Sequence, residues 1–185
     1  MGREYDSIDT RLAAFLLRQP MFFVATAPLD ADGHVNLSPK GMAGTFAVLD
    51  EHRVAYLDLT GSGVETIAHL RENGRVVFMF CTFTGPPRIV RLHGRGEAHV
   101  VGTDRFAELA PHFPTLPGIR SVIEVEVHRV ADSCGYAVPE MDFVRDRTRL
   151  TEWAGARESE ETLAAYQAEK NTTSLDGLPG LPTPT

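Results

Sequence analysis

The chain of 185 residues lacks the features that mark several large classes of protein. Its two cysteines, Cys81 and Cys134, are far apart and fit neither a disulfide framework nor a metal-ligand pair, so we expect both to be reduced. The seven histidines show no helical i, i+4 pair and no His-Glu-x-x-His motif. We therefore predict that the protein has no metal site.

Long apolar runs and an excess of positive charge are also missing. No stretch approaches the length of a membrane span or a secretion signal, so we expect a cytoplasmic protein without a membrane partner. Lys and Arg number 18 against 25 Asp and Glu, and the resulting net charge of −7 disfavours nucleic acid and anionic lipid. The expected partner is a small molecule. A hydrophobic content of 43% can supply the core of one ordinary domain.

What the chain does contain is a series of short β-like runs separated by turns. Consecutive runs joined by tight turns predict hairpins arranged as a meander, and strict alternation of apolar and polar residues predicts strands with one buried face. The helices are too few and too short for a doubly wound parallel sheet. We therefore expect a mainly β fold, a closed or nearly closed antiparallel barrel with a few helices. The predicted strands are 21–27, 34–38, 46–49, 53–59, 76–83, 89–101 and 121–130.

Helical spacing of apolar residues is confined to four segments. We predict helices over 8–17 with Asp6 or Ser7 as N-cap, over 64–71 with a stop at Asn73-Gly74, over 103–110 with Thr103 as N-cap, and over 158–170. The last residues are rich in Thr and Pro and offer little to bury. The expected organisation is one domain with its N-terminal helix over 1–155, a C-terminal helix over 156–170 and a disordered tail over 171–185.

A glycine-rich turn, Thr60-Gly61-Ser62-Gly63, stands between a predicted strand and a predicted helix. Such a turn presents free backbone N–H groups and the positive end of a helix dipole, which together favour a phosphate. Thr60, Ser62 and Thr66 add hydroxyl groups that can bind an anion or, in the alternative interpretation, only cap the helix. Either a phosphate site or an ordinary connection is consistent with the turn alone.

Two cations are candidates to reach an anion at this turn. Lys40 lies in Ser-Pro-Lys-Gly, where the proline fixes the backbone and the glycine allows a close approach; its alternative role is a solvated loop residue. Period two places Arg88 and Arg91 on opposite faces of one strand, and we favour Arg91 over Arg88 as the residue that faces a ligand. The carboxylate of Glu65, which disfavours a phosphate, is expected to pair with Lys40 or His69. The sequence offers no acid–base pair, and catalytic residues stay unassigned.

Taken in order, these segments resemble the pyridoxamine 5'-phosphate oxidase-like family. The likeness rests on residues 34–41, 56–66, 70–74 and 88–94, covers about 8–132, and extends to 133–139 and 149–153 in an uncharacterised branch. It implies a six-stranded antiparallel split barrel of the FMN-binding type. The family binds FMN, or in some branches a deazaflavin or haem, at the interface of a homodimer.

The resemblance also implies which residues lie at the cofactor. It places Asn36, Ser38 and Lys40 along the flavin, and it places Thr60, Ser62, Glu65 and Thr66 at the phosphate. It further implies a lid from the region after the last strand, with Trp153 available to stack on an aromatic ring. The expected cofactor-binding residues, with Arg91 added, are Asn36, Ser38, Lys40, Thr60, Ser62, Glu65, Thr66, Arg91 and Trp153.

The chain departs from the family pattern at several positions. Glu65-Thr66 replaces an Arg-Lys pair, Ile89 replaces a Gln, and the C-terminal arginine that holds the vitamin in the oxidases is absent. Oxidation of pyridoxamine phosphate is therefore not the expected activity. The leading hypothesis is an FMN-dependent oxidoreductase acting on an unknown small molecule. The alternatives are a non-enzymatic protein that stores or senses a flavin, deazaflavin or haem, and an acidic β-barrel dimer that serves as an interaction module.

Overall fold

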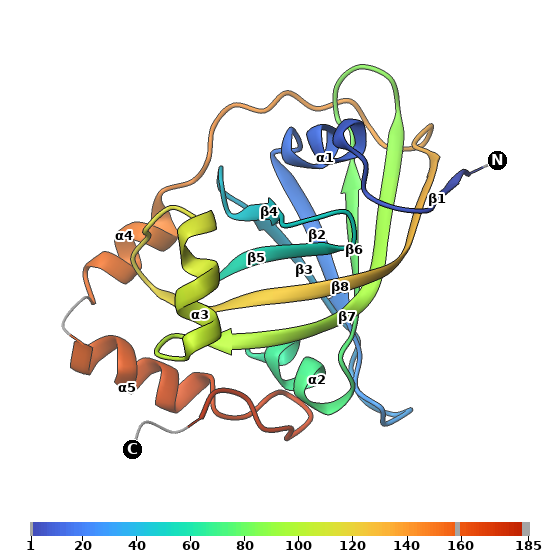
Figure 1. Ribbon diagram of the computed structural model, residues 1–185. Helices are drawn as coiled ribbons and strands as arrows, with labels where there is room; N and C mark the ends of the chain where they lie inside the picture. Colours follow the sequence, from blue (N-terminus) through green and yellow to red (C-terminus); the bar gives the residue numbers. More distant parts are fainter. Residues whose placement is uncertain (1, 158–159, 183–185) are drawn as a thin grey trace.

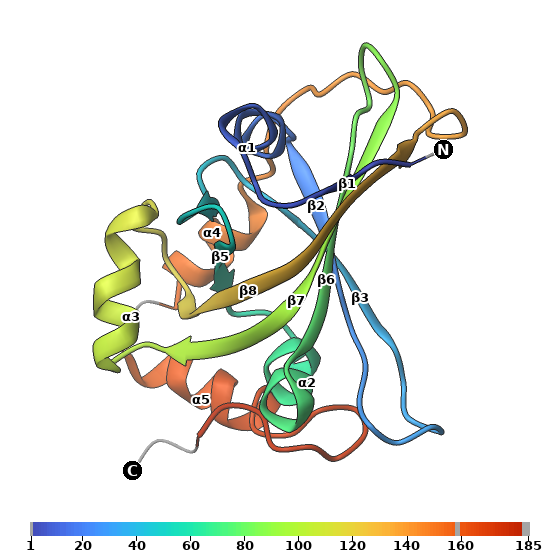
Figure 2. The same ribbon diagram turned by 45° about the vertical axis from the view of Figure 1, so that its right-hand side comes forward.

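One curled antiparallel sheet forms most of the molecule in the computed structural model, which describes residues 2–157 and 160–182 (Figure 1). The strand order is β3-β2-β6-β7-β8-β5-β4, and β1 pairs with β8 outside this path. Figure 2 shows how the long strands β7 and β8 bend as they cross the sheet. The strands are β1 (Glu4–Tyr5), β2 (Met21–Thr26), β3 (Asn36–Gly41), β4 (Phe46–Val48), β5 (Arg53–Leu59), β6 (Arg75–Cys81), β7 (Arg88–Val100) and β8 (Ile119–Cys134).

This half-barrel confirms the expected fold class and corrects two details of it. The sheet of the described chain has eight strands rather than the six that the resemblance implies, and the two-residue strand β1 was not among the predicted strands. The sheet is also not a simple meander, since β2 pairs with β6 rather than each strand pairing only with its neighbours in sequence. Both hairpins, β2–β3 and β4–β5, form as predicted.

The core lies inside the curl of the sheet, where aromatic side chains from several strands meet. Phe22, Tyr56, Phe78 and Phe80 are almost completely buried, and Phe22 stacks on Phe80 with ring centroids 5.4 Å apart. Apolar residues of α1 and α2 join the same cluster. Burial of such large apolar side chains is the main force that holds the curled sheet together.

Five α-helices and one 3-10 turn surround the sheet in the described chain. The predicted helices form, with two differences: Asp9 rather than Asp6 or Ser7 caps α1, accepting a hydrogen bond from Leu12 N at 2.7 Å, and α4 was not predicted. Gly74 ends α2 in the left-handed conformation with a φ of 70°, as the Asn-Gly stop predicts. The helices are α1 (Thr10–Leu17), α2 (Glu65–Asn73), α3 (Asp104–Leu109), α4 (Arg149–Gly155) and α5 (Glu160–Lys170).

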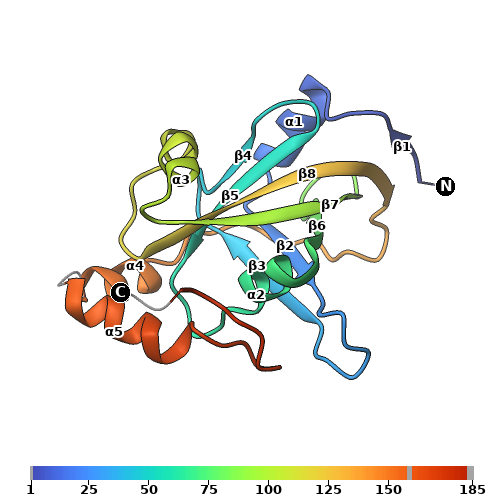
Figure 3. The same ribbon diagram turned by 60° about the horizontal axis from the view of Figure 1, so that its bottom comes forward.

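Residues 171–182 differ from the disordered tail expected over 171–185. They fold back from α5 and run beside α2, as Figure 3 shows, and Asn171 is fully buried. The segment closes on itself, since Leu181 N donates to Asn171 O at 2.7 Å and Gly180 N donates to Thr172 O at 2.8 Å. The prediction from composition was wrong here because backbone groups, rather than apolar side chains, make these contacts. Residues 158–159 of the predicted C-terminal helix and 183–185 of the predicted tail lie outside the described residues.

Candidate functional site

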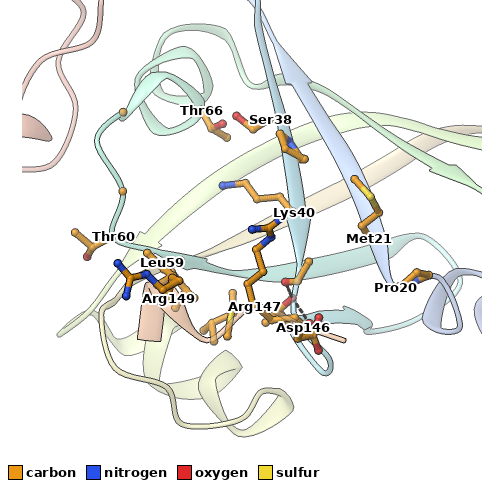
Figure 4. A pocket seen from close by; sticks show the side chains of 18 of the residues that line it. Pro20, Met21, Ser38, Lys40, Leu59, Thr60, Thr66, Asp146, Arg147 and Arg149 are labelled. Atoms are coloured by element: carbon orange, nitrogen blue, oxygen red, sulfur yellow. Dashed lines mark hydrogen bonds between the residues drawn. The ribbon is translucent and has the colours of Figure 1, made fainter. Parts of the chain in front are cut away.

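A cleft of about 770 Å³ opens at the rim of the half-barrel. Its walls come from β3, from the turn between β5 and α2, from the first turn of α2 and from an extended segment before α4 (Figure 4). A volume of this size is typical of sites for small molecules and cofactors. We call Thr60–Gly63 the elbow and residues 142–149 the strap. The polar and charged lining residues are Asn36, Ser38, Lys40, Thr45, Thr60, Glu65, Thr66, Arg120, Arg145, Asp146, Arg147 and Arg149.

A buried carboxylate organises one side of the cleft. Asp58 on β5 is 1% exposed, and its Oδ1 accepts from Lys40 Nζ at 3.1 Å while its Oδ2 accepts from Arg120 Nε at 2.6 Å. Ser121 on β8, the register partner of Asp58, donates to the same carboxylate at 3.3 Å. Burial alone would raise the pKa of Asp58, but Arg120 and Lys40 outweigh it and lower the pKa to about 2. The carboxylate is therefore charged at neutral pH and fixes both cations.

Arg120, which pairs with Asp58, also holds the elbow, and the backbone of Gly118 adds a second contact. Arg120 Nη1 donates to Gly63 O at 2.8 Å, and Thr60 N donates to Gly118 O at 2.7 Å. From Gly61 to Ile67, none of the backbone N–H groups has an acceptor within the described residues. Unpaired N–H groups at the start of a helix are the donors that bind a phosphate in many proteins. The elbow thus has the local chemistry that its sequence predicted.

Hydrogen bonds between β3 and α2 build the upper part of the cleft. Asn36 Nδ2 donates to Thr66 Oγ1 at 3.0 Å and to Thr26 Oγ1 at 3.2 Å, and Ser38 Oγ donates to Asn36 Oδ1 at 3.0 Å. Thr26 also lies 3.0 Å from Nδ1 of the buried His69, whose pKa is lowered by burial. In Figure 4, Ser38 and Thr66 lie side by side above Lys40. These contacts fix Asn36, Ser38 and Thr66 relative to one another at the cleft.

The strap supplies the remaining charge. Arg145, Arg147 and Arg149 all line the cleft, and Asp146 Oδ2 accepts from Ala43 N at 3.2 Å, which ties the strap to the loop after β3. Arg147 extends toward Lys40 in Figure 4, and Arg149 lies near Thr60. Arg145 and Arg147 are exposed and have no ion-pair or hydrogen-bond partner in the described part of the chain. A protein of net charge −7 thus concentrates positive charge at one cleft.

The structure brings six of the nine predicted site residues to this cleft. Three others, Ser62, Arg91 and Trp153, are not among its lining residues. Arg91 Nη1 donates to Ser133 Oγ at 3.1 Å on β8, and Trp153 packs edge-on against Tyr166 at 4.8 Å. The six that do line the cleft are Asn36, Ser38, Lys40, Thr60, Glu65 and Thr66.

Glu65 does not make either of the expected ion pairs. Lys40 pairs with Asp58, and Glu65 Oε1 instead accepts from the backbone N of Leu175 at 3.3 Å. The C-terminal region, which the sequence assigned to a tail, therefore takes up part of the negative charge beside the elbow.

Sequence reasoning missed Asp58, Arg120 and the strap arginines. Asp58 did carry a signal, because it interrupts the apolar run Tyr56-Leu57 and Leu59 in a predicted strand, and a charge at such a position requires a partner. Arg120 carried none, since only the pairing of β5 with β8 brings it to Asp58. In the described residues no group of three or more His, Cys, Asp and Glu is placed to hold a metal. No helix among them is long and apolar enough to cross a membrane.

The fold is a half-barrel with a cationic, amide-lined cleft at its rim, and comparison with known proteins identifies the family. The family model for pyridoxamine 5'-phosphate oxidase matches residues 8–134, so the chain belongs to this family and the resemblance seen in the sequence is confirmed. Its sequence is 42% identical over 192 residues to the pyridoxamine 5'-phosphate oxidase family protein ustO of Aspergillus flavus, covering 96% of this chain and 77% of the relative.

Solved structures of low sequence identity share the fold. HupZ of Group A Streptococcus superposes with a TM-score of 0.51 at 20% identity, over 68% of this chain and 99% of that one. A FAD-binding protein of Mesorhizobium loti gives 0.50 at 15% identity, over 71% and 96%. These likenesses show a shared fold.

Proposed function

We propose that this protein is an FMN-dependent oxidoreductase that acts on a small molecule, with the cofactor bound in the cleft between β3, the elbow and the strap. When bound there, the flavin ring supplies hydride or electron transfer. The protein's own residues bind the phosphate, orient the ring and limit access of water. The single observation that carries this proposal is the run of unpaired backbone N–H groups from Gly61 to Ile67 beside Lys40.

The donor set of the cleft fits a phosphorylated cofactor. Lys40 provides an ammonium whose position is fixed by Asp58, and Thr66 provides a hydroxyl fixed by Asn36. The arginines of the strap add charge that a phosphate dianion can bind bidentately. This set takes the place of the Arg-Lys pair that the sequence lacks at Glu65-Thr66. The FAD-binding relative of the same fold supports a flavin as the ligand.

We further propose that a second copy of the chain closes the cleft. Leu37 on the edge strand β3 is 62% exposed and stands between two cleft residues, and Phe143 and Val144 on the strap are 59% and 87% exposed. Exposed apolar side chains of this size on the edge strand and on the strap favour a protein partner. A homodimer would cover them and enclose the flavin. Both cysteines are free, which supports the proposed cytoplasmic location.

A storage or sensing role is the second candidate. Both carboxylates of the cleft are engaged, Glu65 with Leu175 N and Asp146 with Ala43 N, so neither is poised as an acid or base. Among the cleft residues of the described chain there is no His or Cys to bind a haem iron, which favours FMN or a deazaflavin over haem.

Two measurements test these proposals. Purified protein mixed with FMN should show flavin absorbance after gel filtration, and native mass spectrometry should give the mass of two chains and two FMN. Colourless protein that FMN cannot reconstitute contradicts the binding proposal. Steady oxidation of a nicotinamide cofactor with an added acceptor supports the oxidoreductase; tight FMN binding without turnover supports storage.

A further inference from the structure

The C-terminal segment, residues 167–181, makes direct contacts with the elbow. Gln167 Nε2 on α5 donates to Thr60 Oγ1 at 2.8 Å, and Asn171 Nδ2 donates to Gly61 O at 2.9 Å. Thr60 and Asn171 are both fully buried, whereas their partners Gln167 and Gly61 are half-buried. The two contacts hold the first half of the elbow from the side opposite to Arg120, which holds Gly63. Thr60, Gly61 and Gly63 of the elbow are therefore each held by a residue that is distant in the sequence.

The C-terminal segment is itself anchored at several points. Arg71 on α2 donates to Gly180 O, and Asp176 accepts from His34 Nδ1 at 2.6 Å on the hairpin β2–β3. Gly180 lies so close that an added Cβ would stand 2.3 Å from Asn171 O and 2.7 Å from the Val64 side chain. A glycine is needed at this point because the two backbones touch. Asn171 is thus held in place by structure on both sides of it.

We propose that the C-terminal segment is a positioning clasp for phosphate recognition, with Gln167 and Asn171 holding the elbow in the conformation that presents its N–H groups. The inference rests on the proposed function, because it assigns the phosphate of the cofactor to this elbow. Gly61 and Gly63 leave the turn intrinsically flexible, and a flexible turn loses conformational entropy when it binds an anion. Hydrogen bonds that fix the turn before binding remove that cost.

Binding of FMN and of riboflavin, which lacks the phosphate, separates this role from general structural support. We expect Asn171→Ala to lower the ratio of the riboflavin Kd to the FMN Kd about 10-fold, and Gln167→Ala about 5-fold, in line with the loss of one hydrogen bond each. Flavin fluorescence quenching measures both constants. A variant that only loosens the barrel changes both affinities together and leaves the ratio unchanged.

Two control variants make the comparison strict. Glu169→Gln changes an exposed residue between Gln167 and Asn171 and should leave the ratio at its wild-type value. Ile123→Val removes one methylene from the barrel core and should lower the melting temperature without lowering the ratio. If Asn171→Ala fails to fold, Gln167→Ala, whose side chain is only partly buried, carries the test.

Backbone order parameters of the unliganded protein provide a second readout that needs no flavin. We expect the order parameters of the Gly61 and Gly63 amides to be about 0.85 in the wild type, as in rigid backbone. In Asn171→Ala they should fall below about 0.6, the range of flexible backbone. Unchanged order parameters together with an unchanged affinity ratio overturn the clasp. If wild-type protein binds no FMN but the order parameters fall, the proposed cofactor is wrong and the clasp on the elbow stands.

Discussion

The elbow and the strap line the same cleft, yet the elbow is fixed by buried hydrogen bonds while the strap presents exposed guanidinium groups. Thr60 and Asn171 are fully buried at the elbow, whereas the side chain of Arg149 on the strap is 91% exposed. An anion bound at the elbow meets donors that are already ordered, while one bound at the strap must order long side chains. Charge alone therefore does not locate the binding site. We expect the elbow to determine the affinity for the anion and the strap to change that affinity only slightly.

The largest effect is expected from removing the carboxylate behind the elbow. Asp58→Ala leaves Arg120, whose side chain is 5% exposed, without its partner, and should lower the free energy of unfolding by about 3 to 5 kcal/mol. Urea denaturation measures this loss. As a control, Glu152→Ala on α4 removes exposed contacts to Arg149 and Thr148 and should change stability by less than about 0.5 kcal/mol. A loss below about 1 kcal/mol for Asp58→Ala would show that the elbow side is not held by this network.

Low pH should lower the folding stability that Asp58 contributes beside the cleft. The pKa of Asp58 is about 2 in the folded protein against 3.8 in the unfolded chain, so the unfolded state binds the proton first as the pH falls. The stabilisation is complete above pH 4 to 5 and is lost as the pH approaches 2, a decrease of about 2 kcal/mol. Thermal melts of the wild type and of Asp58→Asn over this range test it. If both lose stability in parallel, another group is responsible.

Cofactor affinity should depend on Lys40 more than on any strap arginine. Lys40→Ala removes the one ammonium that Asp58 fixes beside the elbow and should weaken FMN binding about 10- to 30-fold. The affinity for riboflavin, which has no phosphate, should fall much less. Lys170→Ala, at an exposed position that pairs with Glu169, is the matched control and should leave both affinities unchanged. Equal losses for FMN and riboflavin would place Lys40 at the ring rather than at the phosphate.

The smallest effect is expected on the strap. Arg147→Gln should weaken FMN binding about 2- to 5-fold at low salt and hardly at all at high salt, because exposed charges are screened. Titrations with FMN at two ionic strengths measure the difference. A loss larger than that of Lys40→Ala would reverse the comparison and make the strap the main anion-binding wall.

Much of the fold could be predicted because local signals were strong. Apolar or alternating runs located β5 to β8, the Asn-Gly stop ended α2, and the glycine turn marked the elbow. Lys40 and Thr66 were predicted at the site and do line the cleft. The choice between Arg88 and Arg91 could not succeed, because the arginine that reaches the cleft from the sheet is Arg120 on another strand.

Other features depended on contacts that no local pattern reveals. The polar, Pro-rich composition of residues 171–182 predicted disorder, since composition reports how many apolar side chains can be buried. It does not report backbone hydrogen bonds such as Leu181 N to Asn171 O. Trp153 offered a ring for stacking, but the register of α4 against α5 places it on Tyr166 instead.

The sequence by itself determined the strands, the short helices and the glycine elbow, because these follow from side-chain periodicity and backbone freedom over a few residues. The tertiary structure alone decided that Lys40, Asp58 and Arg120 meet, since they lie on three strands whose pairing is set by the burial of the whole core. It also decided that the C-terminal segment packs on the elbow. Contacts over such sequence separations carry an entropic cost that only the complete fold offsets.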